Sequence, residues 1–218
     1  QDVSREIGLS QHGAGADVPH PAVEGHGLRG GEVEFQQPGS PVAQEESQQQ
    51  APVPTVEIAG EAYPVNLEEL DLSGKGLTDS DLANLEQMTG LKTLNLEGNP
   101  EIRDLTPISG LTSLEHLELP SPSQISDLSP LSGLRGLTSL SVGESFGSQQ
   151  PVSQIQDYSP LAGLTGLKEL SLSVTNISDF SFLEGMKELE TLRLMGSMVT
   201  GDLTFAKGLT NLKELRVV

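Results

Sequence analysis

Few residues of this sequence have the types and the spacing that catalysis needs. His116 lies beside Glu115 and Glu118 and is the one candidate for a general base. The sequence contains no cysteine, no G-x-x-x-x-G-K-[ST] loop and no G-x-G-x-x-G segment after a predicted strand. We expect no serine in a nucleophile-elbow motif. We therefore predict that this protein is not an enzyme and needs no cofactor.

Metal binding is also not predicted. His12, His20 and His26 have a spacing that matches no common metal site, and no cysteine or carboxylate pattern accompanies them. All three lie in residues 1–53, which are rich in glutamine, glycine and proline. Because such a segment buries too little apolar surface to offset its ordering entropy, we expect a disordered tail or linker.

Residues 125–142 contain one complete repeat, from which we predict the secondary-structure elements that position the remaining polar residues. Leucines recur there at every third position and then at a spacing of two, ending at Leu140 and Val142. A spacing of three indicates a tight helical turn, and a spacing of two indicates a strand with one buried face. One such unit leaves its leucines half exposed, so it must stack on copies of itself.

The copies recur along the chain at intervals of 22 to 30 residues. Their first strand leucines are Leu70, Leu94, Leu117, Leu140, Leu170, Leu192 and Leu215. This period and the L-x-x-L-x-L pattern are typical of leucine-rich repeats. We predict an α/β leucine-rich repeat solenoid, with a curved, parallel, concave sheet of about seven strands and short helical or 3₁₀ convex segments.

The repeats also share a longer motif, Ile-x-Asp-Leu-Thr/Ser-Pro-Ile/Leu-x-Gly-Leu. It occurs at residues 102–111 and 125–134, with Tyr158 in place of leucine at 155–164, and more loosely at 177–186. In this motif the sequence resembles the internalin family of bacterial surface proteins, over roughly residues 67–218. The resemblance implies a secreted or wall-attached bacterial protein that binds another macromolecule.

Several local signals predict how the solenoid is closed and capped. The repeat domain is expected to cover residues 54–218, with a capping hairpin at 54–66 that turns at Ala59-Gly60. Thr106-Pro107 and its equivalents are expected to place a hydroxyl at the N-cap of each helical turn. Asn99 is the one asparagine at the turn position that usually carries an asparagine ladder.

Charge and hydropathy restrict the partners. The 218 residues carry a formal net charge of −19, which repels nucleic acid and anionic lipid. No apolar run approaches the roughly 18 residues of a transmembrane helix, so we expect no membrane insertion. A protein partner is the remaining class.

Side chains that alternate with the strand leucines should point out from the concave face. The predicted partner-binding residues are therefore Glu69, Asp71, Thr93, Asn95, His116, Glu118, Ser139, Ser141, Glu169, Ser171, Arg193, Met195 and Arg216. Phe146, in an insertion at residues 143–154, is a further candidate. At the C-terminus, Leu209, Leu212, Leu215 and Val217 are expected to lie exposed, which would allow end-to-end association.

These observations favour a non-enzymatic protein-binding module at the bacterial cell surface or outside the cell. Two alternatives remain open. One is an intracellular scaffold that resembles the phosphatase-regulatory leucine-rich repeat proteins. The other is a passive structural spacer.

Overall fold

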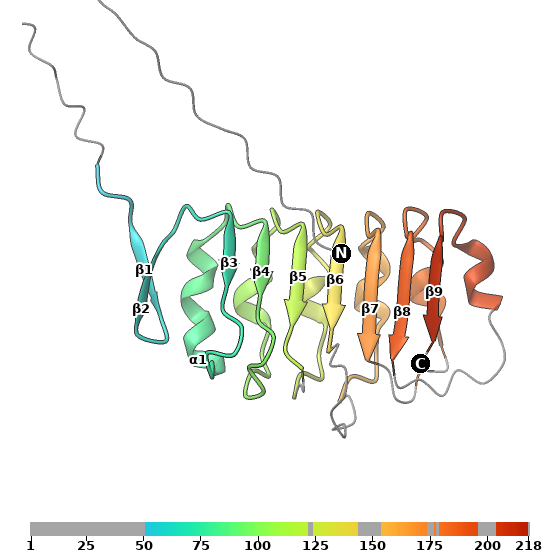
Figure 1. The fold of residues 1–218 in the computed structure, drawn as a ribbon, viewed down its shortest axis with the longest axis horizontal. Coiled ribbons are helices and arrows are strands. Elements are labelled where there is room, and N and C mark those ends of the chain that lie inside the picture. The colour runs from blue at the N-terminus through green and yellow to red at the C-terminus, as the bar shows by residue number, and fades with distance from the viewer. Residues whose placement is uncertain are drawn as a thin grey trace, which may run out of the picture. The chain divides into compact units, whose positions relative to one another are not determined.

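The seven Leu-x-Leu segments form one parallel sheet whose strands lie in sequence order (Figure 1). The strands are β3 (Glu69–Asp71), β4 (Thr93–Asn95), β5 (His116–Leu119), β6 (Ser139–Val142), β7 (Glu169–Ser173), β8 (Thr191–Met195) and β9 (Glu214–Val217). The strand leucines pair in register, from Leu70 with Leu94 through to Leu192 with Leu215. The predicted leucine-rich repeat solenoid is confirmed.

This computed structural model describes residues 51–121, 124–143, 154–173, 177, 179–195 and 204–217. They belong to one compact unit, Gln49–Val218. The predicted tail lies outside the described residues as far as position 50, and so does Phe146. Among the described residues, no helix is long and apolar enough to cross a bilayer.

Short helical turns connect the strands and lie behind the sheet in Figure 1. They are α1 (Asp79–Leu82), η1 (Ala83–Gln87), η2 (Thr106–Ile108), η3 (Ser129–Leu131), η4 (Ser159–Gly163), η5 (Ser181–Leu183) and η6 (Thr204–Gly208). Their leucines and those of the strands fill a single core, in which Leu140 and Leu131 are at most 1% exposed. We call the opposite side of the sheet, away from these turns, the concave face.

The capping of the helical turns differs from the prediction. Thr106 is the first residue of η2, and Leu105 holds the N-cap position without a side-chain hydrogen bond. The acceptor is Asp104, whose Oδ1 accepts the Thr106 backbone N–H at 2.8 Å. Aspartates at the same place serve the other motif copies. The predicted hydroxyl caps are wrong because each helical turn begins at the hydroxyl residue itself, and the aspartate two residues earlier accepts the backbone N–H of that residue.

Asn99 has the structural role that its position predicts. It is fully buried, and its Oδ1 accepts the backbone N–H of Leu77 at 2.9 Å. Its Nδ2 donates to the carbonyl oxygens of Leu72 at 2.9 Å and Leu96 at 2.8 Å. One side chain thus joins the turns of two successive repeats.

A two-stranded hairpin, β1 (Thr55–Ile58) and β2 (Glu61–Pro64), precedes the sheet. It turns at Ala59 and Gly60, which both have positive φ, of 50° and 80°. Val56 and Ile58 are buried in the core of the repeats. Asn84 of η1 donates a 2.7 Å hydrogen bond to the Glu57 carbonyl oxygen. The hairpin therefore covers the apolar end of the first repeat.

The last repeat is less exposed than the sequence predicts. Leu209 is buried, and Leu212 and Leu215 are half-buried against the core. Of the four residues expected to be exposed, only Val217 is, at 41%. Leu212 and Leu215 pack against the core, as does Phe205 of η6, whose ring stacks on Phe180 at a centroid distance of 4.4 Å.

Candidate protein-binding face

Two straight columns of side chains point out from the concave face, because strand residues alternate and all seven strands are in register. One column pairs Glu69, Thr93, His116, Ser139, Glu169, Thr191 and Glu214 across the sheet. The other pairs Asp71, Asn95, Glu118, Ser141, Ser171, Arg193 and Arg216. Met195 follows at the end of β8, opposite Ser173. All predicted concave-face residues lie together on this surface.

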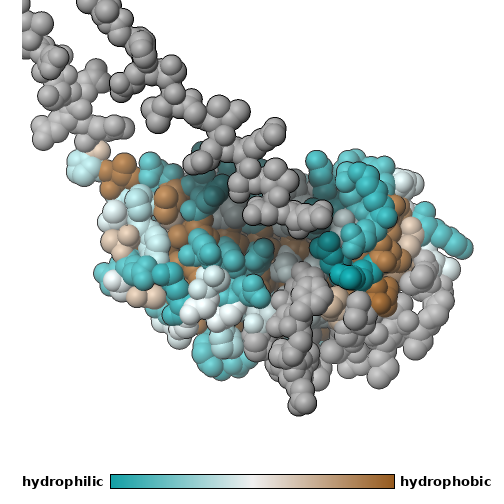
Figure 2. Space-filling model, in the orientation of Figure 1, coloured by the Kyte–Doolittle hydropathy of each residue, from teal (hydrophilic) through white to brown (hydrophobic). Residues whose placement is uncertain are grey.

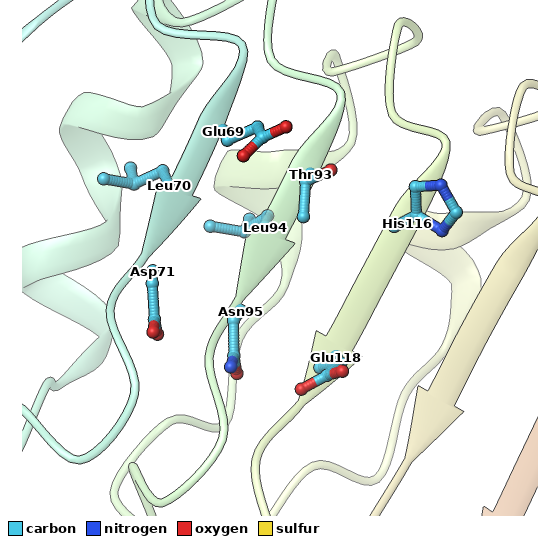
Figure 3. A pocket seen from close by; sticks show the side chains of 8 residues that line it. All are labelled: Glu69, Leu70, Asp71, Thr93, Leu94, Asn95, His116 and Glu118. Carbon is cyan, nitrogen blue, oxygen red and sulfur yellow. The ribbon is translucent and has the colours of Figure 1, made fainter. Parts of the chain in front are cut away.

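The N-terminal half of the face is hollowed over β3, β4 and β5 (Figure 3). The hollow has a volume of about 410 Å³. Two leucines and six polar residues line it, namely Leu70, Leu94, Glu69, Asp71, Thr93, Asn95, His116 and Glu118. We call it the acidic hollow, because its lining contains three carboxylates and only one basic side chain, the imidazole of His116.

Local hydrogen bonds hold two of these side chains in place. The Asp71 Oδ1 atom accepts the backbone N–H of Ser73 at 2.9 Å, and Asn95 Oδ1 accepts the N–H of Glu97 at the same distance. The backbone N–H and the hydroxyl of Ser73 lower the pKa of Asp71, since both stabilise the carboxylate. Asp71 is therefore ionised at neutral pH, and the hollow offers a negative surface to a partner.

The C-terminal half of the face has smaller side chains and two arginines. Ser139 and Ser141 are half-buried and Ser171 is buried, although it belongs to an outward column. Arg193 lies directly opposite Arg216, and its Nε is 3.7 Å from Glu214 Oε1. The face therefore changes from acidic at β3 to a mixed, arginine-containing surface at β8 and β9.

Figure 2 shows how hydropathy is distributed on the visible side of the molecule. Hydrophilic and hydrophobic residues are interspersed there, and no single hydrophobic area covers the whole side. Met195 is half-buried and adds the one large apolar side chain of the predicted set. The predicted concave-face residues are therefore mainly polar and charged.

A row of charged residues at the N-terminal ends of the strands, which we call the charge ladder, was not predicted. It consists of the residues two positions before each strand leucine: Glu68, Lys92, Glu115, Thr138, Lys168, Glu190 and Lys213. Lys92 Nζ is 2.8 Å from Glu68 Oε2, and Lys213 Nζ is 2.7 Å from Glu190 Oε2. The hydrogen bond from Lys213 lowers the pKa of Glu190. The alternation of sign at the repeat period was the sequence signal for this ladder.

The expectation that no serine lies in a nucleophile-elbow motif is wrong at the level of sequence. Ser145 has G-x-S-x-G spacing between Gly143 and Gly147, directly after β6. A nucleophile elbow requires a helix immediately after the serine. Ser145 and the residues that follow it, as far as position 153, lie outside the described residues. In addition, no three metal-ligating side chains converge among the described residues.

Comparison with known proteins agrees with this geometry. The family described as Leucine Rich repeats (2 copies) matches residues 65–111. The crystal structure of internalin C2 from Listeria monocytogenes aligns with 73% of this chain and 78% of its own, at 25% identity and a TM-score of 0.51. No match was found among curated proteins.

A second Listeria monocytogenes internalin, inlF, aligns with 72% of this chain at 21% identity and a TM-score of 0.50. This chain spans about half of that one, 51%, and the likeness concerns the fold. The repeats and the fold define a leucine-rich repeat protein, a class that generally serves as a protein-interaction scaffold. Within that class, the chain is similar in fold to the two Listeria monocytogenes internalins.

Proposed function

We propose that this chain is a non-enzymatic protein-binding module of a secreted or cell-surface bacterial protein. The proposed binding surface is the concave face. The observation that carries the proposal is the continuous, in-register ribbon of outward polar side chains on seven strands. Strands spaced about 4.8 Å apart make this ribbon roughly 30 Å long, which is long enough for a protein partner.

The rigidity of the ribbon supports this proposal. Backbone hydrogen bonds between neighbouring repeats and a leucine core that is almost fully buried hold the strands in place. A partner therefore meets a surface that is already formed, and binding costs little ordering entropy on this side. The likeness to internalins favours a location outside the cell and a protein on a host or cell surface as the partner.

The charge of the acidic hollow selects the type of partner residue it receives. Glu69, Asp71 and Glu118 present carboxylates around a recess of about 410 Å³. Opposite charges across an interface steer association and disfavour wrong partners. We propose that a lysine or arginine of the partner protein occupies this hollow.

A capture experiment with matched charge variants tests the binding face. The wild-type chain is used to capture proteins from a host-cell surface extract. The concave variant carries Glu118→Lys, Arg193→Glu and Arg216→Glu. The control carries Arg135→Glu, Glu184→Lys and Lys207→Glu, which are exposed positions away from the concave face. In each triple variant, one Glu→Lys change adds two positive charges and two changes to glutamate remove two each. Both variants therefore change the net charge by −2.

We expect the wild type and the control to capture the same protein, and the concave variant to lose it. Equal capture by the concave variant would contradict binding through this face. Failure of the folded wild type to capture any protein would favour the passive spacer. Capture only from a cytosolic extract would favour the intracellular scaffold.

A further inference from the structure

Ser171 is an unusual residue in the outward column of the concave face. It is only 5% exposed, and its buried Oγ has no hydrogen-bond partner among the residues that the structure describes. Buried hydroxyls are nearly always hydrogen-bonded, because removing one from water without a partner is unfavourable. A hydroxyl left in this state at a surface intended for contact indicates that the missing partner comes from another molecule.

The neighbours of Ser171 in the same column are all hydrogen-bond donors. Ser141 lies opposite it on β6, Arg193 lies opposite it on β8, and Arg216 follows on β9. We call these four residues the donor row. A serine hydroxyl donates one hydrogen bond, and a guanidinium group only donates. The row therefore fits a group that accepts several hydrogen bonds.

The two arginines indicate the charge of that group. Arg193 and Arg216 are directly opposite each other on neighbouring strands, an arrangement in which like charges repel. The carboxylate recorded near Arg193 is Glu214, whose Oε1 lies 3.7 Å from Nε, beyond hydrogen-bond distance. Glu169 of β7 and Glu214 of β9 lie in the neighbouring outward column, so the formal charges on β7 to β9 balance, but the two guanidinium groups still adjoin each other directly. An anionic acceptor would relieve this repulsion.

We propose that the donor row binds the carboxylate of an aspartate or glutamate of the protein partner. A planar carboxylate matches the fork of a guanidinium group and leaves an oxygen for the Ser171 hydroxyl. A neutral carbonyl group could accept the same hydrogen bonds, but it would not offset the charge of two arginines. This inference rests on the proposed binding function and names the chemistry of one part of that face.

Together with the acidic hollow, this site gives the concave face a direction. The hollow is centred on β4 and the donor row between β7 and β8, three and a half strand intervals or about 17 Å apart. A partner with a basic group at one end and an acidic group at the other fits in one orientation only. In the reverse orientation, like charges would face each other at both ends.

Synthetic peptides provide a probe that does not require the natural partner. The first is an acetylated, amidated nonapeptide of glycine and serine with glutamates at two alternate central positions, and its twin has glutamine there. Binding to the ¹⁵N-labelled full chain is followed by amide chemical shifts at low ionic strength and millimolar peptide. We expect the glutamate peptide to shift the amides of Ser171, Arg193 and Arg216. The glutamine twin should bind at least about tenfold more weakly, as expected when a charge-assisted hydrogen bond becomes a neutral one.

Variants separate a binding role of Ser171 from a structural one. Ser171→Ala should weaken the glutamate peptide about tenfold, the effect of losing a hydrogen bond to a charged group. Its Tm should equal or exceed that of the wild type, because the removed hydroxyl has no partner in the free protein. Ser113→Ala, at an exposed serine in the turn before β5 and outside both outward columns, is the control and should change neither value.

Several results would overturn the carboxylate site. They are equal binding of the two peptides, absence of any shift at the donor row, and a Ser171→Ala variant with a lower Tm and unchanged binding. If these occur while the concave triple variant still fails to capture a partner, the carboxylate site is wrong and the binding face stands. If the concave variant captures normally, the proposed function itself fails.

Discussion

At the scale of single residues, Asn99 joins two successive repeats. Its side chain bonds backbone groups of both repeats that leucine packing alone would leave buried without a hydrogen-bond partner. Its amide bonds the Leu77 N–H and the Leu72 and Leu96 carbonyl oxygens inside the core. Each buried polar group left without a partner costs about 1–3 kcal/mol. Asn99→Ala should therefore lower the free energy of unfolding by about 2 kcal/mol or more.

Urea titration measures this loss, and Asn66→Ala, at an exposed asparagine, is the matched control. We expect the control to change stability by less than about 0.5 kcal/mol. A similar, small effect of both substitutions would mean that Asn99 is not needed to close the turn.

The motif aspartates make the stability of the solenoid depend on pH. The hydroxyl and the backbone N–H of Thr106 lower the pKa of Asp104, and Ser129 does the same for Asp127. The backbone N–H of Ser181 and then its hydroxyl lower the pKa of Asp179. A carboxyl whose pKa is lower in the folded state stabilises the fold above its unfolded pKa, about 3.9. That stability is lost as the pH falls through the folded pKa.

We predict that stability decreases as the pH falls below about 4. The decrease should be smaller in the triple variant Asp104→Asn, Asp127→Asn and Asp179→Asn, which has no carboxyl to protonate at these three caps. Urea titrations at a series of pH values and constant ionic strength measure both curves. Identical pH dependence of the two proteins would show that these caps do not contribute.

At the scale of elements, the alternation along β6 separates core from surface within two residues. Leu140 is 1% exposed and faces the leucine stack, whereas Ser141 is half-buried and faces outward. Leu140→Ala should cost about 2–5 kcal/mol through lost packing and the cavity it leaves. Ser141→Ala should stay within about 0.5 kcal/mol. Denaturant titration distinguishes them, and equal losses at the two sites would mean that the assigned strand phase is wrong.

The strands were predictable from sequence because each leucine lies at a fixed place in a repeated period, and neighbouring copies impose one register. The helical caps were not predicted correctly. Thr106-Pro107 has the sequence of an N-cap residue followed by proline at N1. In the structure, however, η2 begins at Thr106, one residue earlier than predicted, and Asp104 accepts the backbone N–H of Thr106. Whether a helical turn begins at the hydroxyl residue or one residue after it depends on backbone angles, and the residue pattern does not determine these.

The candidate site shows the same limit. The repeat period predicts which residues point outward, and the two columns on the concave face follow directly from it. The burial of Ser171 and the depth of the acidic hollow depend on how side chains from neighbouring strands fill the space between them. The charge ladder that begins with Glu68 and Lys92 is visible when the repeats are aligned. It could have been predicted by comparing the position two residues before each strand leucine, which is not part of the leucine pattern.

At the scale of the whole molecule, the account depends on one claim, that a protein partner covers the concave face. Hydroxyl-radical footprinting tests it directly, because oxidisable side chains lie on and off this face. His116 and Met195 are on it, whereas Tyr63 lies in the hairpin and Phe205 in η6. The oxidation rate of each is measured in the free chain and in the complex with the captured protein. We predict that His116 and Met195 become several-fold less reactive in the complex and that Tyr63 and Phe205 keep their rates; protection of Tyr63 or Phe205 with unchanged His116 and Met195 would contradict the claim.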